Sequence, residues 1–499
     1  VLMILSEFEK KVNAVFYYVF HNPLYLERRY RQYRILFYTY MFGGINEDDV
    51  YFLMLRNLEE YRLEKLFEVK HKDRALLRYF TTETSNKYLK KDGDTYALTQ
   101  NGIEVLWDHL LKRKLLSVNE RESFLASKRR RIDNLSHGHV TGCSVLILAN
   151  MLGNDYDLLV EPNICQREYI RSLGGKSVCR PDALLVKDQE EVYIEADRGK
   201  ETKAQLSLKM ERYENHVLFE TAGNRTILFT IHTEKMKEYE KTAYEVWEQL
   251  RRINEGYAFI CDLKLNDKMN YTEYLQRVKQ MKPELFEEFP IAIKSYLHGL
   301  KCDATVLDMQ RELWTAFEEM VKDSAYGNRR TLIEMVVDEH PEMVKALERG
   351  DQFLICPFIL SPYTIRRTFI DEIMKDKICY EIKRNAADIE KITYKKKEKF
   401  VDEITGVDYT FLHCFICEKT NEEKIYICIE NIVDDYSAFL RIKRLVFNQK
   451  RNYLSELFVV YFAQNNMDYK AASLLAEKYK KSGGEAKIII TEQKDILGL

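Results

Sequence analysis

The chain has 499 residues, of which 46% are hydrophobic and 31% are charged, and its formal net charge is −2. This length exceeds one ordinary hydrophobic core, and the composition excludes a disordered or low-complexity protein. Because the net charge is near zero, any nucleic-acid contact must come from local basic patches and not from a global field.

Cysteine usage and hydropathy predict the compartment. The ten cysteines are scattered, and several lie inside apolar runs, as buried thiols do, which favours a reduced and therefore cytoplasmic localisation. Cys414 and Cys417 form a C-x-x-C without a second pair at zinc-site spacing, so we interpret them as strand residues. No run approaches 18 uncharged apolar residues, and the first apolar run is too short for a signal peptide, so we expect no membrane insertion.

The first 118 residues predict helices followed by a β-hairpin. Phe8 opens an apolar stripe of helical spacing, residues 24–42 form a second helical segment, and Asn46 is a candidate N-cap of a third. Residues 79–82 and 96–98 predict two strands, with a turn at Asp92 and Gly93. This order favours a winged-helix DNA-binding domain over residues 1–118.

Two basic runs are candidates for DNA contact. Arginines interleaved with tyrosines can meet phosphate and sugar through charge and stacking, although a solvated helix face has the same pattern. A second run lies just before the next domain, where it would follow a DNA backbone. The DNA-binding candidates are Arg28, Arg29, Arg31, Arg34, Lys128, Arg129, Arg130 and Arg131, with Tyr30 and Tyr33 between the first four.

Acidic side chains gather at two predicted strands in the middle of the chain. Asp182 follows Pro181 and opens the strand 183–186, and in the strand 192–197 the period of two places Glu195 and Asp197 on one face. Carboxylates about 4 Å apart repel by roughly 4 kcal/mol near a protein surface, so a cation is one way to stabilise them. Oxygen ligands favour Mg2+ or Mn2+.

A helix is predicted immediately after these strands. Thr202 and Gln205 have the spacing of a capping box, so we expect the helix to begin near Lys203. Lys209 and Tyr213 are four residues apart and therefore share one face of this helix.

The motifs R-P-D at residues 180–182, I-E-A-D-R-G at 194–199 and K-x-x-x-Y at 209–213 resemble the replication-relaxation family. That family includes the MobC-class relaxases, and its catalytic domain is similar to the PD-(D/E)xK restriction-endonuclease fold. The resemblance covers residues 90–260 and implies that Asp182 and Glu195 bind metal, with Asp197 as a third catalytic acid. Asp197 occupies the position of the motif's lysine, so Lys209, or else Lys200, would supply the positive charge, and Tyr213 would orient a water or phosphate.

Two further residues are candidates for the same site. Glu161 follows the apolar residues 158–160 and is a possible additional metal ligand. His137 precedes the apolar helix predicted at 143–152, and it resembles the histidine at the family's entry to the catalytic domain. We expect it to be either a catalytic residue or a capping or core histidine.

The remaining chain predicts one more α/β region. Strands at 226–232 and 257–262, with a helix at 235–252, complete a nuclease-like domain over residues 119–262. Residues 263–351 predict a helical connector or a second winged helix. In residues 352–499, strands at 425–430, 457–462 and 487–491 alternate with helices at 437–447 and 469–480, and Ile432 stands where the first copy has Asp197. We expect a degenerate nuclease-like lobe that scaffolds or grips DNA.

The predicted fold class is therefore α/β, α+β overall, and the family resemblance implies a metal-dependent DNA endonuclease. Such a nickase would act on double-stranded DNA at an origin of transfer or replication of a plasmid or conjugative element. Accessory mobilization or coupling proteins would be its partners, and a homodimer is one open arrangement. Two alternatives remain: a non-catalytic winged-helix replication or regulatory factor with an inactive nuclease fold, and a restriction or defence nuclease with little site choice.

Overall fold

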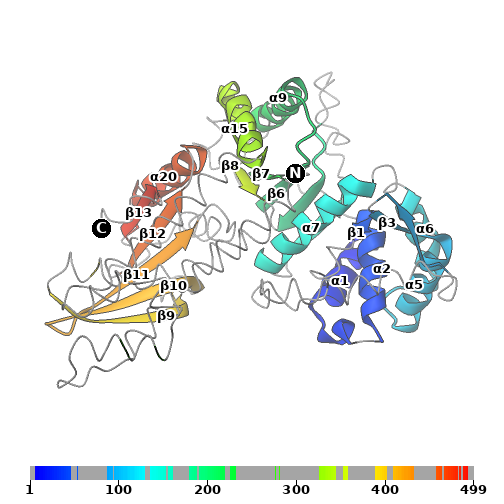
Figure 1. Cartoon of the computed structure of the whole chain (residues 1–499), viewed down its shortest axis with the longest axis horizontal. Helices are drawn as coiled ribbons and strands as arrows, with labels where there is room; N and C mark the ends of the chain where they lie inside the picture. The colour runs from blue at the N-terminus through cyan, green and yellow to red at the C-terminus, as the bar shows by residue number, and fades with distance from the viewer. Residues whose placement is uncertain are drawn as a thin grey trace.

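The computed structural model describes residues 6–27, 29–46, 53, 87–93, 95–129, 135–152, 156–160, 179–187, 190–219, 225–231, 276, 280, 325–343, 352–357, 382, 388–401, 408–431, 457–463, 466–481, 483–484 and 487–492. These residues form a mixed helix and sheet architecture (Figure 1). Several predicted elements lie outside them: the helix after Asn46, the strands 79–82 and 257–262, and the helices 235–252 and 437–447.

The N-terminal part combines helices with a three-stranded antiparallel sheet of order β1-β3-β2. Its helices are α1 (Glu7–His21), η1 (Pro23–Leu26), α2 (Arg31–Phe42), α5 (Gln100–Lys112), η4 (Val118–Glu120) and α6 (Arg121–Arg129), and its strands are β1 (Ile45–Asn46), β2 (Leu89–Asp92) and β3 (Thr95–Leu98). The turn at Gly93 is confirmed by its φ of 59°, and the strand that pairs across it is β2. Asn46 lies in β1.

Local chemistry fixes the start of α5. Thr99 caps the helix, because its hydroxyl accepts the Gly102 N–H at 3.1 Å. A Cβ atom at Gly102 would lie 2.2 Å from the carbonyl oxygen of Tyr88. Glycine therefore allows α5 to begin directly against the hairpin.

The central sheet has the order β4-β5-β6-β7-β8. Its elements are α7 (Leu135–Leu152), β4 (Asp157–Val160), β5 (Ala183–Lys187), β6 (Glu190–Asp197), α9 (Lys203–Phe219), β7 (Arg225–Ile231), α15 (Ala325–Asp338) and β8 (Gln352–Pro357). Strands β4, β5 and β6 are antiparallel neighbours, whereas β7 runs parallel to β6 and β8 parallel to β7. Residues 352–357, which the sequence analysis assigned to the last lobe, form β8 and pair with β7 at the edge of this sheet.

Helices cover both faces of the central sheet. Ser144 of α7 hydrogen-bonds to Thr230 of β7 at 2.9 Å, so α7 lies on the face that Thr230 shares with its register partner Ala196. Tyr213 of α9 contacts Tyr193 of β6 edge to face, so α9 lies on the other face. The predicted alternation along β6 is therefore correct, but both of its faces are buried because each is covered by a helix.

Helix α7 also connects the N-terminal part to the central sheet (Figure 1). A Cβ atom at Gly138 would lie 1.9 Å from the carbonyl oxygen of Phe42, at the end of α2. This close approach places the first turn of α7, and with it His137, between the two parts.

The C-terminal sheet has the order β13-β12-β11-β10-β9. Its elements are β9 (Ile389–Val401), β10 (Asp408–Lys419), β11 (Lys424–Asn431), β12 (Leu457–Ala463), α20 (Asn466–Lys481) and β13 (Lys487–Glu492). In chain order its neighbours pair antiparallel, antiparallel, parallel and parallel, as in the central sheet. Cys414 and Cys417 are buried strand residues, as predicted.

Within the described part of the chain, no helix has both the length and the apolar character that crossing a membrane requires.

Candidate active site

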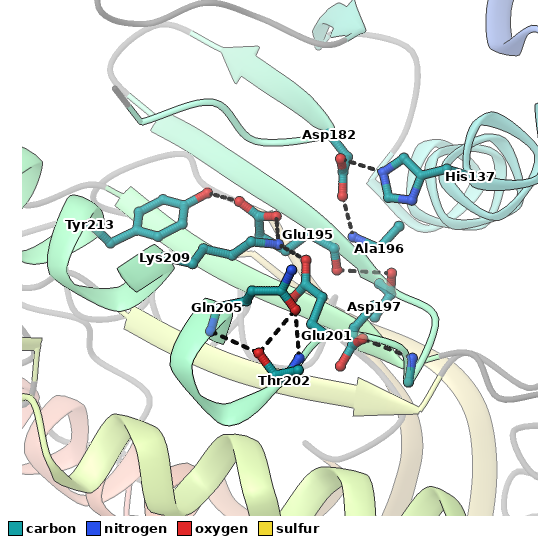
Figure 2. Close-up of polar contacts among 12 residues, drawn as sticks. His137, Asp182, Glu195, Ala196, Asp197, Glu201, Thr202, Gln205, Lys209 and Tyr213 are labelled. Carbon is teal, nitrogen blue, oxygen red and sulfur yellow. Dashed lines mark hydrogen bonds and ion pairs between the residues drawn. The ribbon is translucent and has the colours of Figure 1, made fainter. Parts of the chain in front are cut away.

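Asp182 and His137 meet beside the central sheet. Asp182 lies just before β5, and one of its carboxylate oxygens accepts the backbone N–H of Ala196 at 2.7 Å. Its other oxygen lies 2.5 Å from Nε2 of His137, in the first turn of α7 (Figure 2). His137 therefore contacts a residue that the sequence predicted for the same site, and its catalytic role stays a prediction.

Glu195 is the buried centre of a second group of contacts. Its Oε2 accepts a hydrogen bond from Nζ of Lys209 at 2.9 Å, and its Oε1 accepts one from the hydroxyl of Tyr213 at 2.5 Å (Figure 2). The predicted capping box is present, because Thr202 and Gln205 bond to each other in both directions. This cap sets the start of α9, and the i, i+4 spacing then directs Lys209 and Tyr213 to the same carboxylate.

Burial sets the protonation behaviour of these groups. Removal from water raises the pKa of Glu195 to about 7; Lys209 acts against this rise, while the charge of Asp182 adds to it. Burial alone would lower the pKa of His137, but the hydrogen bond to Asp182 and its charge outweigh burial, so the net pKa is raised. Burial also lowers the pKa of Lys209. The charges of Glu195 and Glu201 raise it by more, so the net pKa of Lys209 is raised.

Asp197, which the resemblance implied as a third catalytic acid, is engaged by a buried arginine in the structure. Its carboxylate is fully buried and accepts two hydrogen bonds from the guanidinium of Arg329, at 2.6 Å from Nε and 2.9 Å from Nη2. Arg329 also donates to the carbonyl oxygen of Glu201 at 2.6 Å. Sequence reasoning missed Arg329 because it lies 132 residues after Asp197, on α15.

Glu201 was also missed from the sequence. Its Oε1 accepts a second hydrogen bond from Nζ of Lys209 at 2.9 Å, so Lys209 is shared between Glu195 and Glu201 (Figure 2). The other oxygen, Oε2, is buried without a hydrogen-bond partner within the described structure. The sequence feature that could have identified Glu201 is its position directly before the cap residue Thr202.

The described residues contain no group of three or more His, Cys, Asp or Glu side chains that could hold a metal ion. Asp182 and Glu195 nevertheless supply two carboxylates from the ends of neighbouring strands, and the charge of Asp182 raises the pKa of Glu195. Mg2+ commonly takes one or two carboxylates and completes its coordination with water and substrate phosphates. Two carboxylates are fewer than a protein-only metal site would need, so the binding of Mg2+ or Mn2+ at this position stays a prediction.

The arginines of the N-terminal basic run differ in burial, since Arg34 is buried and Arg29 is exposed. Arg34 was predicted to contact DNA, but it is buried, donates to the carbonyl oxygen of Val19 at 3.2 Å and has a pKa that burial lowers to about 9. Arg29 instead lies over the ring of Tyr30, with Cζ 4.7 Å from the ring centroid. Arg113, from the end of α5, lies over the same ring at 4.6 Å. Two arginines from distant segments thus share one aromatic ring.

The other candidates are placed only in part. Arg31 begins α2, and Lys128 and Arg129 end α6. Glu161, Arg28, Arg130 and Arg131 lie outside the described residues, so their predicted roles stay predictions.

No family model, no curated protein and no solved structure matches this chain.

Proposed function

We propose that this protein is a metal-dependent DNA endonuclease that nicks double-stranded DNA. The observation that carries the proposal is the convergence of Asp182, Glu195 and Lys209 at the junction of β5, β6 and α9. The order helix, three antiparallel strands, helix and parallel strand, from α7 to β7, supports a restriction-endonuclease-like core. A strongly shifted, buried carboxylate beside a lysine is also typical of a catalytic site.

Each side chain has a distinct task in this proposal. A divalent cation held by Asp182 and Glu195 would supply an acidified water and a positive charge beside the phosphate. Lys209 would add a fixed positive charge for the developing negative charge, and Glu201 keeps its ammonium in place. Tyr213 is buried, so its hydroxyl orients the Glu195 carboxylate instead of contacting DNA.

His137 would hold the Asp182 carboxylate in one orientation. Its Nε2 contacts one oxygen while the Ala196 N–H holds the other, which fixes both oxygens. The raised pKa of His137 also makes it a candidate general acid near neutral pH.

Duplex binding is supported by the N-terminal part. A short strand after α2 and a hairpin, in the order β1-β3-β2, support a winged-helix domain. Arg29 and Arg113, both over Tyr30, offer phosphate contacts at its surface. Changing both arginines to glutamine should lower the salt dependence of duplex binding, with a slope change of about 2. An unchanged slope would show that the pair is an ordinary surface feature.

The decisive experiment is cleavage of supercoiled plasmid, with and without the element's own origin region, in Mg2+, Mn2+ or chelator. We expect nicked circles that require a divalent cation, and a loss of at least about 100-fold in Glu195→Gln and in Lys209→Met. Lys203→Gln is the matched control, because this exposed lysine begins the same helix and, among the described residues, forms its ion pair with the exposed Glu339. Full activity of Glu195→Gln in folded protein would exclude the proposed site.

Preference for the origin plasmid would support the finer role of origin-specific nicking at a plasmid or conjugative element, for which the sequence resemblance is the basis. Equal cutting of both plasmids would instead favour a nuclease with little site choice. Accessory mobilization or coupling proteins would be sought only after the first outcome.

A second candidate function is a DNA-binding factor on an inactive nuclease fold. It is favoured by two observations. Lys209 is engaged by two carboxylates, and Asp197, which stands at the motif's lysine position, is held by Arg329. Duplex binding without nicking in either metal would select this candidate.

A further inference from the structure

The C-terminal sheet repeats the central sheet without its pair of acids. In the central sheet Ala183 pairs with Ile194, so the next pair outward is Asp182 and Glu195. In the C-terminal sheet His413 pairs with Ile429, and the next pair outward is Leu412 and Glu430. The position of Asp182 is thus taken by a leucine, and this pair has one carboxylate where the central sheet has two.

The two sheets also differ at the edge strand that opens each of them. In the central sheet this strand is β4, with four residues and no lysine. In the C-terminal sheet it is β9, with thirteen residues, and its lysines 391, 395 and 399 are exposed. These three lysines have even spacing, so they share one side of the strand. We name them the lysine edge.

Neighbouring acids hold Lys391 and Lys395 of the lysine edge only weakly. Lys391 pairs with Glu418 at 3.4 Å, and Lys395 pairs with Glu398 at 3.2 Å. All four side chains are partly or largely exposed, and such surface pairs contribute about 0 to 1 kcal/mol. A polyanion can therefore replace these acids at low cost.

Lysines on an edge strand also prevent edge-to-edge aggregation, so exposure alone does not indicate a ligand. The spacing adds a second argument. An antiparallel strand rises about 3.4 Å per residue, which equals the axial rise per phosphate along one DNA strand. The three lysines therefore span about 27 Å, or about eight phosphates, and each is four residues from the next.

We propose that the lysine edge of β9 binds the phosphate backbone of duplex DNA. The C-terminal sheet would thus hold the DNA on which the central sheet acts. This inference rests on the proposed function, because it takes duplex DNA as the substrate. It assigns the C-terminal lobe one binding surface, Lys391, Lys395 and Lys399, on the strand farthest from β13 and α20 (Figure 1).

The test compares two triple variants of the full chain in a Glu195→Gln background, which separates binding from cutting. The first is Lys391→Gln, Lys395→Gln and Lys399→Gln; the control is Lys470→Gln, Lys480→Gln and Lys481→Gln, which removes three exposed lysines from α20 at the other side of the same sheet. The affinity for a labelled duplex of about 40 base pairs is measured between about 50 and 200 mM salt.

We expect the logarithm of affinity to depend less steeply on the logarithm of salt in the β9 variant, with the slope reduced by about 2 to 3, and the control to stay within about 0.5 of the parent. An unchanged slope in the β9 variant, or an equal loss in both variants, would overturn the proposal while leaving the nuclease function intact. A parent protein that binds no duplex would instead remove the proposed function itself. Circular dichroism of each variant verifies that it is folded.

Discussion

Glu195 is almost completely buried. It accepts hydrogen bonds from Lys209 and Tyr213 and also lies in the field of the Asp182 charge. Desolvation is the largest influence and raises its pKa to about 7, while Lys209 and the hydroxyl of Tyr213 act in the opposite direction. The folded state therefore holds a proton that the unfolded state releases near its ordinary value of 4.5. This proton stabilises the fold fully below that value, and its contribution is lost as the pH rises through about 7.

The difference in unfolding free energy between the wild type and Glu195→Gln should therefore depend on pH, because glutamine does not ionise. Without divalent cations, we expect the unfolding free energy of the wild type, relative to that of the variant, to fall by about 2 to 3 kcal/mol between pH of about 5 and 8. Urea denaturation at several pH values measures this difference. Glu122→Gln, which removes an exposed carboxylate on α6, is the control. A difference independent of pH would contradict the raised pKa of Glu195.

At the scale of elements, α15 and the residues after it are fastened to α9 and the end of β6. Arg329 holds Asp197, and Lys203 pairs with Glu339. His340 completes the attachment, with Nδ1 2.8 Å from a carboxylate oxygen of Glu214 and Nε2 3.2 Å from the Ser207 hydroxyl. Residues 325–343, the larger described part of the predicted connector, therefore pack against α9 and β7, and Arg329 steadies the loop that carries Glu201.

We expect Arg329→Met to destabilise the protein by about 3 to 5 kcal/mol, because it leaves the buried Asp197 carboxylate without its counter-ion. Adding Asp197→Asn should recover more than half of this loss, since the uncompensated charge is then gone. Urea denaturation of the single and double variants gives both values. A loss below about 1 kcal/mol in the single variant would mean that the pair is not formed as described.

At the scale of the whole molecule, the chain returns to the central sheet after a long excursion. Strand β8 pairs in parallel with β7 although more than a hundred residues separate them, and α20 of the C-terminal lobe contacts β8. The two sheets are thus joined through β8, as the middle of Figure 1 shows.

Two truncations test this arrangement. A chain that ends at residue 387 keeps all five strands of the central sheet, whereas one that ends at residue 351 lacks β8 and exposes the edge of β7. We expect the longer chain to remain soluble and to unfold cooperatively, and the shorter one to aggregate, because an unpaired strand edge recruits other chains. Size-exclusion chromatography and thermal unfolding compare them. Equal behaviour of both chains would contradict a structural role for β8.

The sequence by itself determined the local elements of the site. Period-two alternation gave the faces of β6, the Thr202 and Gln205 cap gave the start of α9, and the i, i+4 rule placed Lys209 beside Tyr213. These features depend on residues close in the chain, whose geometry is fixed by backbone periodicity. The alternation of strands and helices in the last lobe could also be predicted, because each element shows its own local periodicity.

Only the tertiary structure decided which charged side chains are buried or ion-paired. Asp197 was predicted to be a catalytic acid, and the structure shows that it forms a buried ion pair with Arg329, 132 residues away. Arg34 belongs to the same basic run as the exposed Arg29, yet packing buries Arg34. Local patterns carry no information on a partner so distant in sequence, because burial and ion pairing depend on how separate elements pack, and packing also decided that β8 belongs to the central sheet.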